Sequence, residues 1–232
     1  MNSFDKTIIQ FVLSHFDRSY NLYHSFIFLA DHDNLLKGGI LAILIWFFWF
    51  KNNQPTAEER LSIIATLISV FFVMVIALGI AGLAPFRARP ILNPQFVFIS
   101  SDSIDPIISQ LSSFPSDHAA LFVSISTGFF FVSRITGLFA ILYTVIFILF
   151  PRLYLGYHYP TDLIAGSFIG AFITILFNRS KIIRQLISGN IMPWMEKYPS
   201  FFYSILFLVT YEIADLFTGS RNILWFLHSF NR

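Results

Sequence analysis

The chain contains no cysteine, and only 12% of its 232 residues are charged. The absence of cysteine excludes disulfide bonds, thiolate-based structural metal sites and a thiol nucleophile. Soluble domains carry about 25% charged residues, so this chain has too few to cover the surface of a soluble domain. Hydrophobic residues make up 56% of the sequence. Together these features predict an integral membrane protein.

Charge also bears on the partners. The formal net charge is +2, which is too small to indicate binding to nucleic acid. We therefore expect the lipid bilayer, and no nucleic acid, as the main partner. The composition says nothing about the oligomeric state.

The hydrophobic runs predict an all-α bundle of five or six transmembrane helices in a single domain, residues 1–232. Residues 4–30 alternate apolar and polar positions at helical spacing, which is typical of a helix in the membrane interface. Residues 61–84 are the clearest span, because they contain no charge and about 20 apolar residues suffice to cross a bilayer. The other expected spans are residues 35–50, 115–132, 135–150 and 161–177, with residues 201–217 as a candidate for the last.

Two features complete this plan. Lys37 is the charged residue of the first span, and we expect its side chain to reach the membrane surface. Basic residues collect in the short loops at one end of the spans, which marks that end as cytoplasmic. These residues are Lys51, Arg60, Arg134, Arg179, Lys181 and Arg184.

Three polar clusters lie at the opposite ends of the apolar segments. In the expected topology all three meet on the outer face of the membrane. The clusters are Arg87-Ala88-Arg89-Pro90, then Pro115-Ser116-Asp117-His118, and finally Arg152 followed by His158 and Asp162.

The second cluster is suited to an anion. Pro115 fits the first turn of a helix, which then contains Ser116, Asp117 and His118. Unpaired backbone N–H groups and the positive end of the helix dipole attract a phosphate there. The hydroxyl of Ser116 and the ring of His118 can contact its oxygens.

The third cluster resembles the machinery of nucleophilic catalysis. Pro160 marks a helix start, and the spacing of four places His158 and Asp162 on one face. An acid there can hold the imidazole in one tautomer and stabilise its charged form, which leaves the other nitrogen to attack phosphorus. Arg89 and Arg152 supply planar guanidinium groups for the phosphate oxygens.

Each cluster alone also fits an ordinary polar turn at the membrane surface. All three together, embedded in hydrophobic helices, favour phosphoryl transfer from a phosphate that a lipid carries. Glu212 and Asp215, near the end of the last apolar segment, are expected at the interface rather than in the site.

The spacing Arg-Pro, Pro-Ser-x-His and Arg-x5-His-x3-Asp resembles the type 2 phosphatidic acid phosphatase superfamily, with residues 35–177 as the catalytic core. Residues 178–232 would form a C-terminal extension. The resemblance implies that His158 is the nucleophile, Asp162 its orienting partner and His118 the general acid. It assigns phosphate binding to Arg89, Arg152 and Ser116, and it implies no metal and no cofactor.

The clusters depart from the family pattern at three positions. Gly82 stands where the family has a lysine, and Arg87 is expected to take over part of that role as a substrate-binding residue. Asp117 replaces a glycine and joins the substrate-binding set, and Pro151 replaces a serine.

The forms Phe-Pro-Ser-Asp-His and His-Tyr-Pro-Thr-Asp are most similar to bacterial undecaprenyl-diphosphate phosphatases of the bacitracin-resistance type. This resemblance implies an enzyme of the bacterial inner membrane that hydrolyses undecaprenyl diphosphate to the monophosphate, with its site facing the periplasm or cell exterior. One alternative is a phosphatidylglycerophosphate or phosphatidic acid phosphatase, or a phosphotransferase acting on a second lipid. Another is a non-catalytic membrane protein or transporter.

Overall fold

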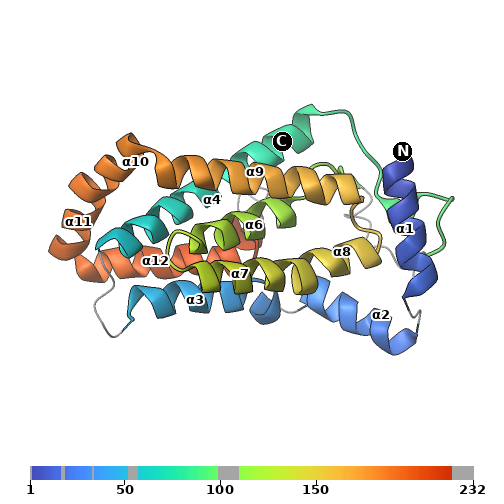
Figure 1. Ribbon diagram of the computed structural model, residues 1–232, viewed down its shortest axis with the longest axis horizontal. Helices are drawn as coiled ribbons and strands as arrows, with labels where there is room; N and C mark the ends of the chain where they lie inside the picture. The colour runs from blue at the N-terminus through green and yellow to red at the C-terminus, as the bar shows by residue number, and fades with distance from the viewer. Residues whose placement is uncertain (1, 17–18, 33, 52–56, 99–109, 221–232) are drawn as a thin grey trace, which may run out of the picture.

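The computed structural model describes residues 2–16, 19–32, 34–51, 57–98 and 110–220, so parts of the polar connections 52–60 and 85–111 lie outside it. Within the described ranges the chain is helical and has no strand, which confirms the prediction of an all-α membrane bundle (Figure 1). Its α-helices are α1 (Ser3–His15), α2 (Tyr20–Ile27), α3 (Ile40–Trp49), α4 (Ala57–Leu83), α6 (Asp117–Phe129), α7 (Arg134–Tyr143), α8 (Phe150–Tyr154), α9 (Pro160–Arg179), α10 (Lys181–Leu186), α11 (Met192–Lys197) and α12 (Pro199–Ala214). Short helical turns of other types are η1 (Phe28–His32), η2 (Leu35–Gly39), η3 (Pro90–Leu92), η5 (Thr144–Leu149) and η6 (Ile187–Ile191).

Three described helices are long and apolar enough to cross a membrane. They are α4, α9 and the continuous helix Arg134–Tyr154, which joins α7, η5 and α8. These correspond to the expected spans 61–84, 161–177 and 135–150. The expected spans 35–50 and 201–217 form the shorter apolar helices Leu35–Trp49 and Pro199–Ala214. The expected span 115–132 contains α6, which has 13 residues.

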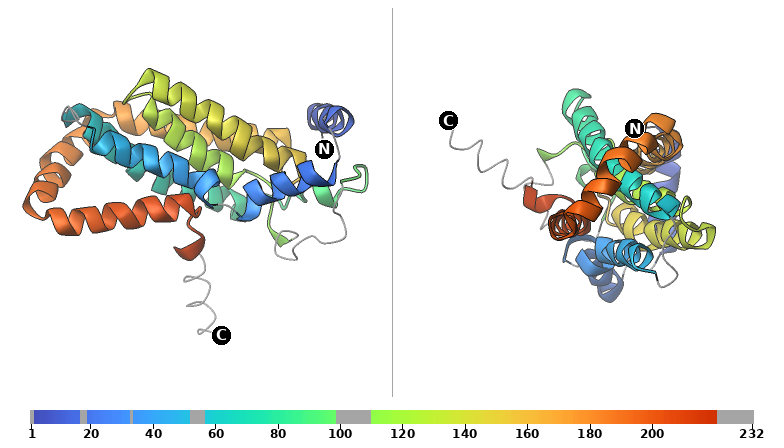
Figure 2. Two further views of the ribbon diagram at one scale, coloured as in Figure 1. Left: turned by 90° about the horizontal axis from the view of Figure 1, so that it is seen from below. Right: turned by 90° about the vertical axis from the view of Figure 1, so that its left-hand side faces the viewer.

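Helix α6 lies at the centre of the bundle, packed against α4, α7 and α9 (Figures 1 and 2). Its contact with α9 is close because α9 presents Gly166 and Gly170: a Cβ atom at Gly170 would lie 2.2 Å from the backbone oxygen of Ala120. Such pairs of small residues let helices approach in membranes. The hydroxyl of Thr174 adds hydrogen-bonding contacts to Ser124 (2.6 Å) and Ser69 (3.0 Å), which link α9 to α6 and α4.

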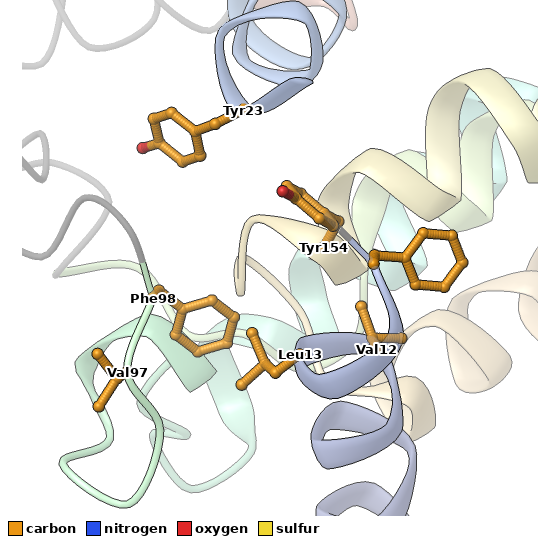
Figure 3. A pocket seen from close by; sticks show the side chains of 7 residues that line it. Val12, Leu13, Tyr23, Val97, Phe98 and Tyr154 are labelled. Carbon is orange, nitrogen blue, oxygen red and sulfur yellow. The ribbon is translucent and has the colours of Figure 1, made fainter. Parts of the chain in front are cut away.

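The N-terminal segment differs from the single helix predicted for residues 4–30. Helix α1 ends before Phe16, and α2 begins after its N-cap Ser19. Helix α1 crosses one end of the bundle (Figure 1). Its Val12 and Leu13 approach Phe98 and Tyr154 around a small apolar pocket (Figure 3). The N-terminal helices therefore cover the end of the bundle at which α9 begins.

The C-terminal part returns along the bundle. Helices α10 and α11 turn the chain at the end opposite α1, and α12 then runs back beside α3 and η2 (Figure 2). The indole N–H of Trp46 donates to the Thr210 hydroxyl (3.0 Å), and the Asn34 amide donates to the Asp215 carboxylate (2.7 Å). Asp215 thus lies at the junction of α12 with the first apolar segment.

Candidate active site

The fold brings the three polar clusters together at the end of the bundle where α6 and α9 begin. The loop after α4 pairs with the segment before α6, since the Ser113 N–H donates to the Arg87 carbonyl (2.9 Å). The Ser116 N–H donates to the Asp162 carbonyl (3.2 Å), which joins the second cluster to the third. These backbone contacts connect segments that are far apart in the sequence.

His158 lies in the loop before α9 rather than on the helix, and its side chain is 3% exposed. Its Nδ1 atom is 2.9 Å from the Ser113 carbonyl oxygen and 4.0 Å from Asp162 Oδ2. A carbonyl can only accept, so this contact favours the tautomer with hydrogen on Nδ1 and leaves Nε2 with a lone pair.

Electrostatics support a neutral ring. Burial first, and the positive charge of Arg89 second, lower the pKa of His158 to about 3. At neutral pH the imidazole is therefore uncharged, which a nitrogen nucleophile requires.

Asp162 occupies the first turn of α9 and is completely buried. Oδ2 accepts the backbone N–H of Tyr159 (2.8 Å), the residue before Pro160, which begins the helix as predicted. Oδ1 accepts a hydrogen bond from Arg87. Asp162 is thus a helix-capping group as well as a neighbour of His158.

The second cluster begins α6 slightly later than expected. Ser116 is the N-cap, its hydroxyl accepts the Ala119 N–H (3.3 Å), and the helix starts at Asp117 rather than at Pro115. Asp117 Oδ1 accepts the backbone N–H of His118 (2.8 Å) and lies 2.9 Å from its Nδ1. The acid that replaces the family's glycine therefore contacts the His118 ring.

The three arginines have different surroundings. Arg152 is 1% exposed and donates to the carbonyls of Ile148 (3.1 Å) and Ala30 (2.7 Å). Arg89 donates to the Tyr157 carbonyl (3.1 Å). Arg87, expected to bind substrate, is instead paired with two buried carboxylates, and its role as a substrate ligand stays a prediction.

A cavity of about 430 Å³ opens between α4 and the start of α6. Arg89, Asp117 and His158 form its polar side, and Ala77 and Leu78 of α4 belong to its apolar wall. The arrangement suits a molecule with an anionic head and a hydrocarbon chain. Gly82 also lines this cavity and has open space where its Cβ would be.

Asp117, His118 and His158 could also hold a metal ion. Their ligand atoms lie within 4.8 Å of one another, and histidine with carboxylate suits transition metals. The positive charges of Arg89 and Arg152, however, act on the same two rings. Because like charges repel, this environment favours an anion over a cation.

Sequence reasoning missed three groups near the site. Lys37 does not reach the surface as expected, since it is 8% exposed and its charge acts on the His118 ring. The sequence did contain a signal for Lys37, because a charged residue within a membrane span is a functional candidate by default. The Ser113 carbonyl and the buried carboxylate of Asp5 have no comparable signal in the sequence.

Comparison with known proteins covers the same region. The sequence model of the PAP2 superfamily matches residues 60–184, a range that contains all eight predicted site residues. Lipid A 1-diphosphate synthase of Escherichia coli (strain K12) is 30% identical over 174 residues, which are 72% of this chain and 68% of that protein. No solved structure matches the chain.

Proposed function

The chain belongs to the PAP2 superfamily, and on that premise we propose that it removes the terminal phosphoryl group of a lipid diphosphate through a phosphohistidine at His158. The observation that carries the proposal is the pairing of two histidines, with ligand atoms within 4.8 Å of each other. One of them, His158, lines a partly apolar cavity together with Arg89. A neutral His158 and nearby arginines are what metal-free phosphoryl transfer needs.

In the first step the lone pair of His158 Nε2 attacks phosphorus. An N–P bond forms while the bond from phosphorus to the bridging oxygen breaks. The Ser113 carbonyl keeps hydrogen on Nδ1 throughout, and Arg89 and Arg152 neutralise the charge on the equatorial oxygens. His118 donates a proton to the leaving oxygen, so a lipid monophosphate departs.

In the second step water attacks the phosphohistidine. His118, now neutral, accepts a proton from the water, as microscopic reversibility requires. The N–P bond breaks, inorganic phosphate leaves and His158 regains its free nitrogen. Asp162 is close enough to stabilise the positive charge that the ring carries in the intermediate.

As substrate we propose a polyprenyl diphosphate, undecaprenyl diphosphate, at the outer leaflet of a bacterial inner membrane. The apolar α4 wall beside the polar groups supports a long hydrocarbon chain. The basic residues at the opposite ends of the spans support an outward-facing site. Phosphatidic acid and phosphatidylglycerophosphate are the competing substrates.

A second candidate is phosphoryl transfer to a lipid instead of to water. The name of the E. coli relative favours it, since a lipid A 1-diphosphate synthase makes a diphosphate on a lipid. The first step would be unchanged, and a phosphate group of the acceptor lipid would attack phosphohistidine in place of water.

Assays of the purified protein would test these proposals. Phosphate release would be measured from undecaprenyl diphosphate, phosphatidic acid and phosphatidylglycerophosphate, with and without lipid A as acceptor. We expect the fastest turnover with the diphosphate, and label transferred to lipid A would select the second candidate. A ³²P-labelled intermediate should be trapped in alkaline detergent, in which phosphohistidine survives.

His158→Ala should abolish turnover and the trapped label, whereas His24→Ala, at an exposed histidine of α2, should leave both unchanged. Label that persists in His158→Ala would place the nucleophile elsewhere. No phosphate release from any of the three lipids would refute the phosphatase proposal.

A further inference from the structure

Asp5 is a buried carboxylate in a helix that is otherwise largely exposed. Its side chain is completely buried, although Phe4 and Phe11 of the same helix α1 are 48% and 55% exposed. Buried carboxylates need charged or hydrogen-bonding partners. Asp5 finds all of its recorded side-chain partners in segments more than 80 residues away in the sequence.

Those partners belong to the active site end of the bundle. Asp5 Oδ2 accepts hydrogen bonds from Arg87 Nη2 (2.7 Å) and from the Thr161 hydroxyl (2.8 Å). Asp5 Oδ1 accepts the Thr161 backbone N–H (3.0 Å). That N–H is among the first of α9, so a carboxylate from α1 caps the N-terminus of α9.

Arg87 connects Asp5 to Asp162, the expected orienting partner of His158. Its Nη2 faces Asp5, and its Nη1 donates to Asp162 Oδ1 and to the Thr161 hydroxyl (2.9 Å). The guanidinium also lies over the Tyr159 ring, 4.2 Å from the centroid. One guanidinium is therefore held between two buried carboxylates.

This geometry determines which oxygens Asp162 has available. While Asp5 binds Nη2, Arg87 donates through Nη1 to Oδ1 of Asp162. Oδ2 of Asp162 is then free to accept the Tyr159 N–H, and it lies 4.0 Å from His158 Nδ1. Without Asp5, Arg87 could present both nitrogens of its planar group to Asp162, the bidentate geometry that guanidinium and carboxylate prefer. That would turn Asp162 away from Tyr159 and His158.

We propose that Asp5 is a positioning residue of the active site, through which α1 holds Arg87, Thr161 and Asp162 in the arrangement that serves His158. The inference rests on the proposed phosphohistidine mechanism. It also extends the functional unit beyond residues 60–184, which the family's sequence model matches. The competing explanation is that Asp5 only fastens α1 to the bundle.

The test uses the full-length protein in detergent micelles with p-nitrophenyl phosphate, a soluble substrate whose good leaving group needs no lipid contact. Asp5→Asn keeps the size of the side chain but removes its charge. We expect kcat to fall about 10- to 100-fold, the scale of a misplaced catalytic group, with little change in KM. Formation of the trapped phosphoenzyme should slow by the same factor.

Two control variants and one independent variant sharpen the test. Lys6→Gln and Thr7→Ala, at exposed neighbours on α1, should retain wild-type kcat. Thr161→Val removes the hydroxyl between Asp5 and Arg87 and should lower kcat in the same way. The double variant Asp5→Asn/Thr161→Val should lose less than the product of the two single losses, because both act through one network.

The outcomes separate the explanations. A loss of kcat that merely follows the folded fraction, measured by thermal unfolding of each variant, would overturn the inference. So would a loss confined to lipid substrates, because it would assign α1 to lipid docking instead. If the wild type forms no phosphoenzyme, the proposed function itself has failed, whereas an active wild type with unchanged Asp5→Asn contradicts only this inference.

Discussion

Phosphorylation of His158 should be almost independent of pH between about pH 8 and pH 5. With a pKa of about 3, roughly 1% of the rings are protonated at pH 5. An imidazole with the ordinary pKa of about 6.5 would be about 97% protonated at that pH, which would slow the attack about 30-fold. The shift follows from burial first and from Arg89 second.

The assay is the rate of phosphoenzyme formation from p-nitrophenyl phosphate, quenched in alkaline detergent and corrected for ionisation of the substrate phosphate. This leaving group needs little protonation, so the titration of His118 has little effect on the rate. A fall of about 30-fold centred near pH 6.5 would refute the argument that the buried His158 stays neutral.

The same pKa shift predicts the pH dependence of stability. Between about pH 6.5 and pH 3 the unfolded chain binds more protons at His158 than the folded protein does, so stability falls as the pH falls. At pH 5 the loss is about 2 kcal/mol. Unfolding by SDS titration in mixed micelles should therefore show a smaller loss of stability from pH 8 to pH 5 in His158→Gln than in the wild type. An equal loss in both proteins would contradict the predicted shift.

Four further predictions concern other parts of the molecule. His118→Ala should lower turnover of lipid substrates about 10²- to 10⁴-fold, the usual contribution of general acid catalysis. The loss should be smaller for p-nitrophenyl phosphate, and equal losses would show that His118 does not protonate the leaving group. Turnover should persist in excess chelator and be inhibited by vanadate, because histidine and arginines supply what metals otherwise provide; magnesium-dependent recovery from chelator would contradict this. Gly170→Ala should lower the free energy of unfolding by about 1–3 kcal/mol, because its Cβ would collide with α6. Gly79→Ala, which has open space at its Cβ, should not lower it. Equal stabilities of the two variants would refute the close contact between α6 and α9. In intact cells an impermeant thiol reagent should label Gln95→Cys and not Ser188→Cys, and the natural chain has no cysteine to interfere; the reverse pattern would invert the topology.

Much of the fold followed from hydrophobic length alone. The sequence of residues 61–84 and 161–177 predicts helices because a long, largely apolar segment can cross a bilayer only as a helix or as part of a closed barrel. The break between α1 and α2 was missed, since the periodicity of residues 4–30 continues through it. The short length of α6 was also missed, because apolar residues outside a helix look the same in sequence as those within it.

The candidate site was less predictable than the helices that carry it. The Pro-Ser-x-His spacing indicated a helix start, and α6 does begin there. The spacing of His158 and Asp162 indicated a shared helix face, but His158 lies in the loop, where tertiary contacts decide the side-chain direction. The ion pairs of Arg87 join segments far apart in the chain, and no local pattern encodes such contacts.

The hydrogen-bond acceptor that selects the His158 tautomer is a main-chain oxygen, the carbonyl of Ser113. This determines which kinds of mutation can disturb the tautomer. Ser113 is completely buried, so a larger side chain would not fit, but Ser113→Ala leaves the carbonyl in place, and an alanine scan would classify this position as tolerant. Damage would come instead from changes that shift the backbone, such as a disturbance of the Ser113–Arg87 pairing. A feature of this kind is robust to truncation of the side chain yet vulnerable to insertions or deletions between α4 and α6.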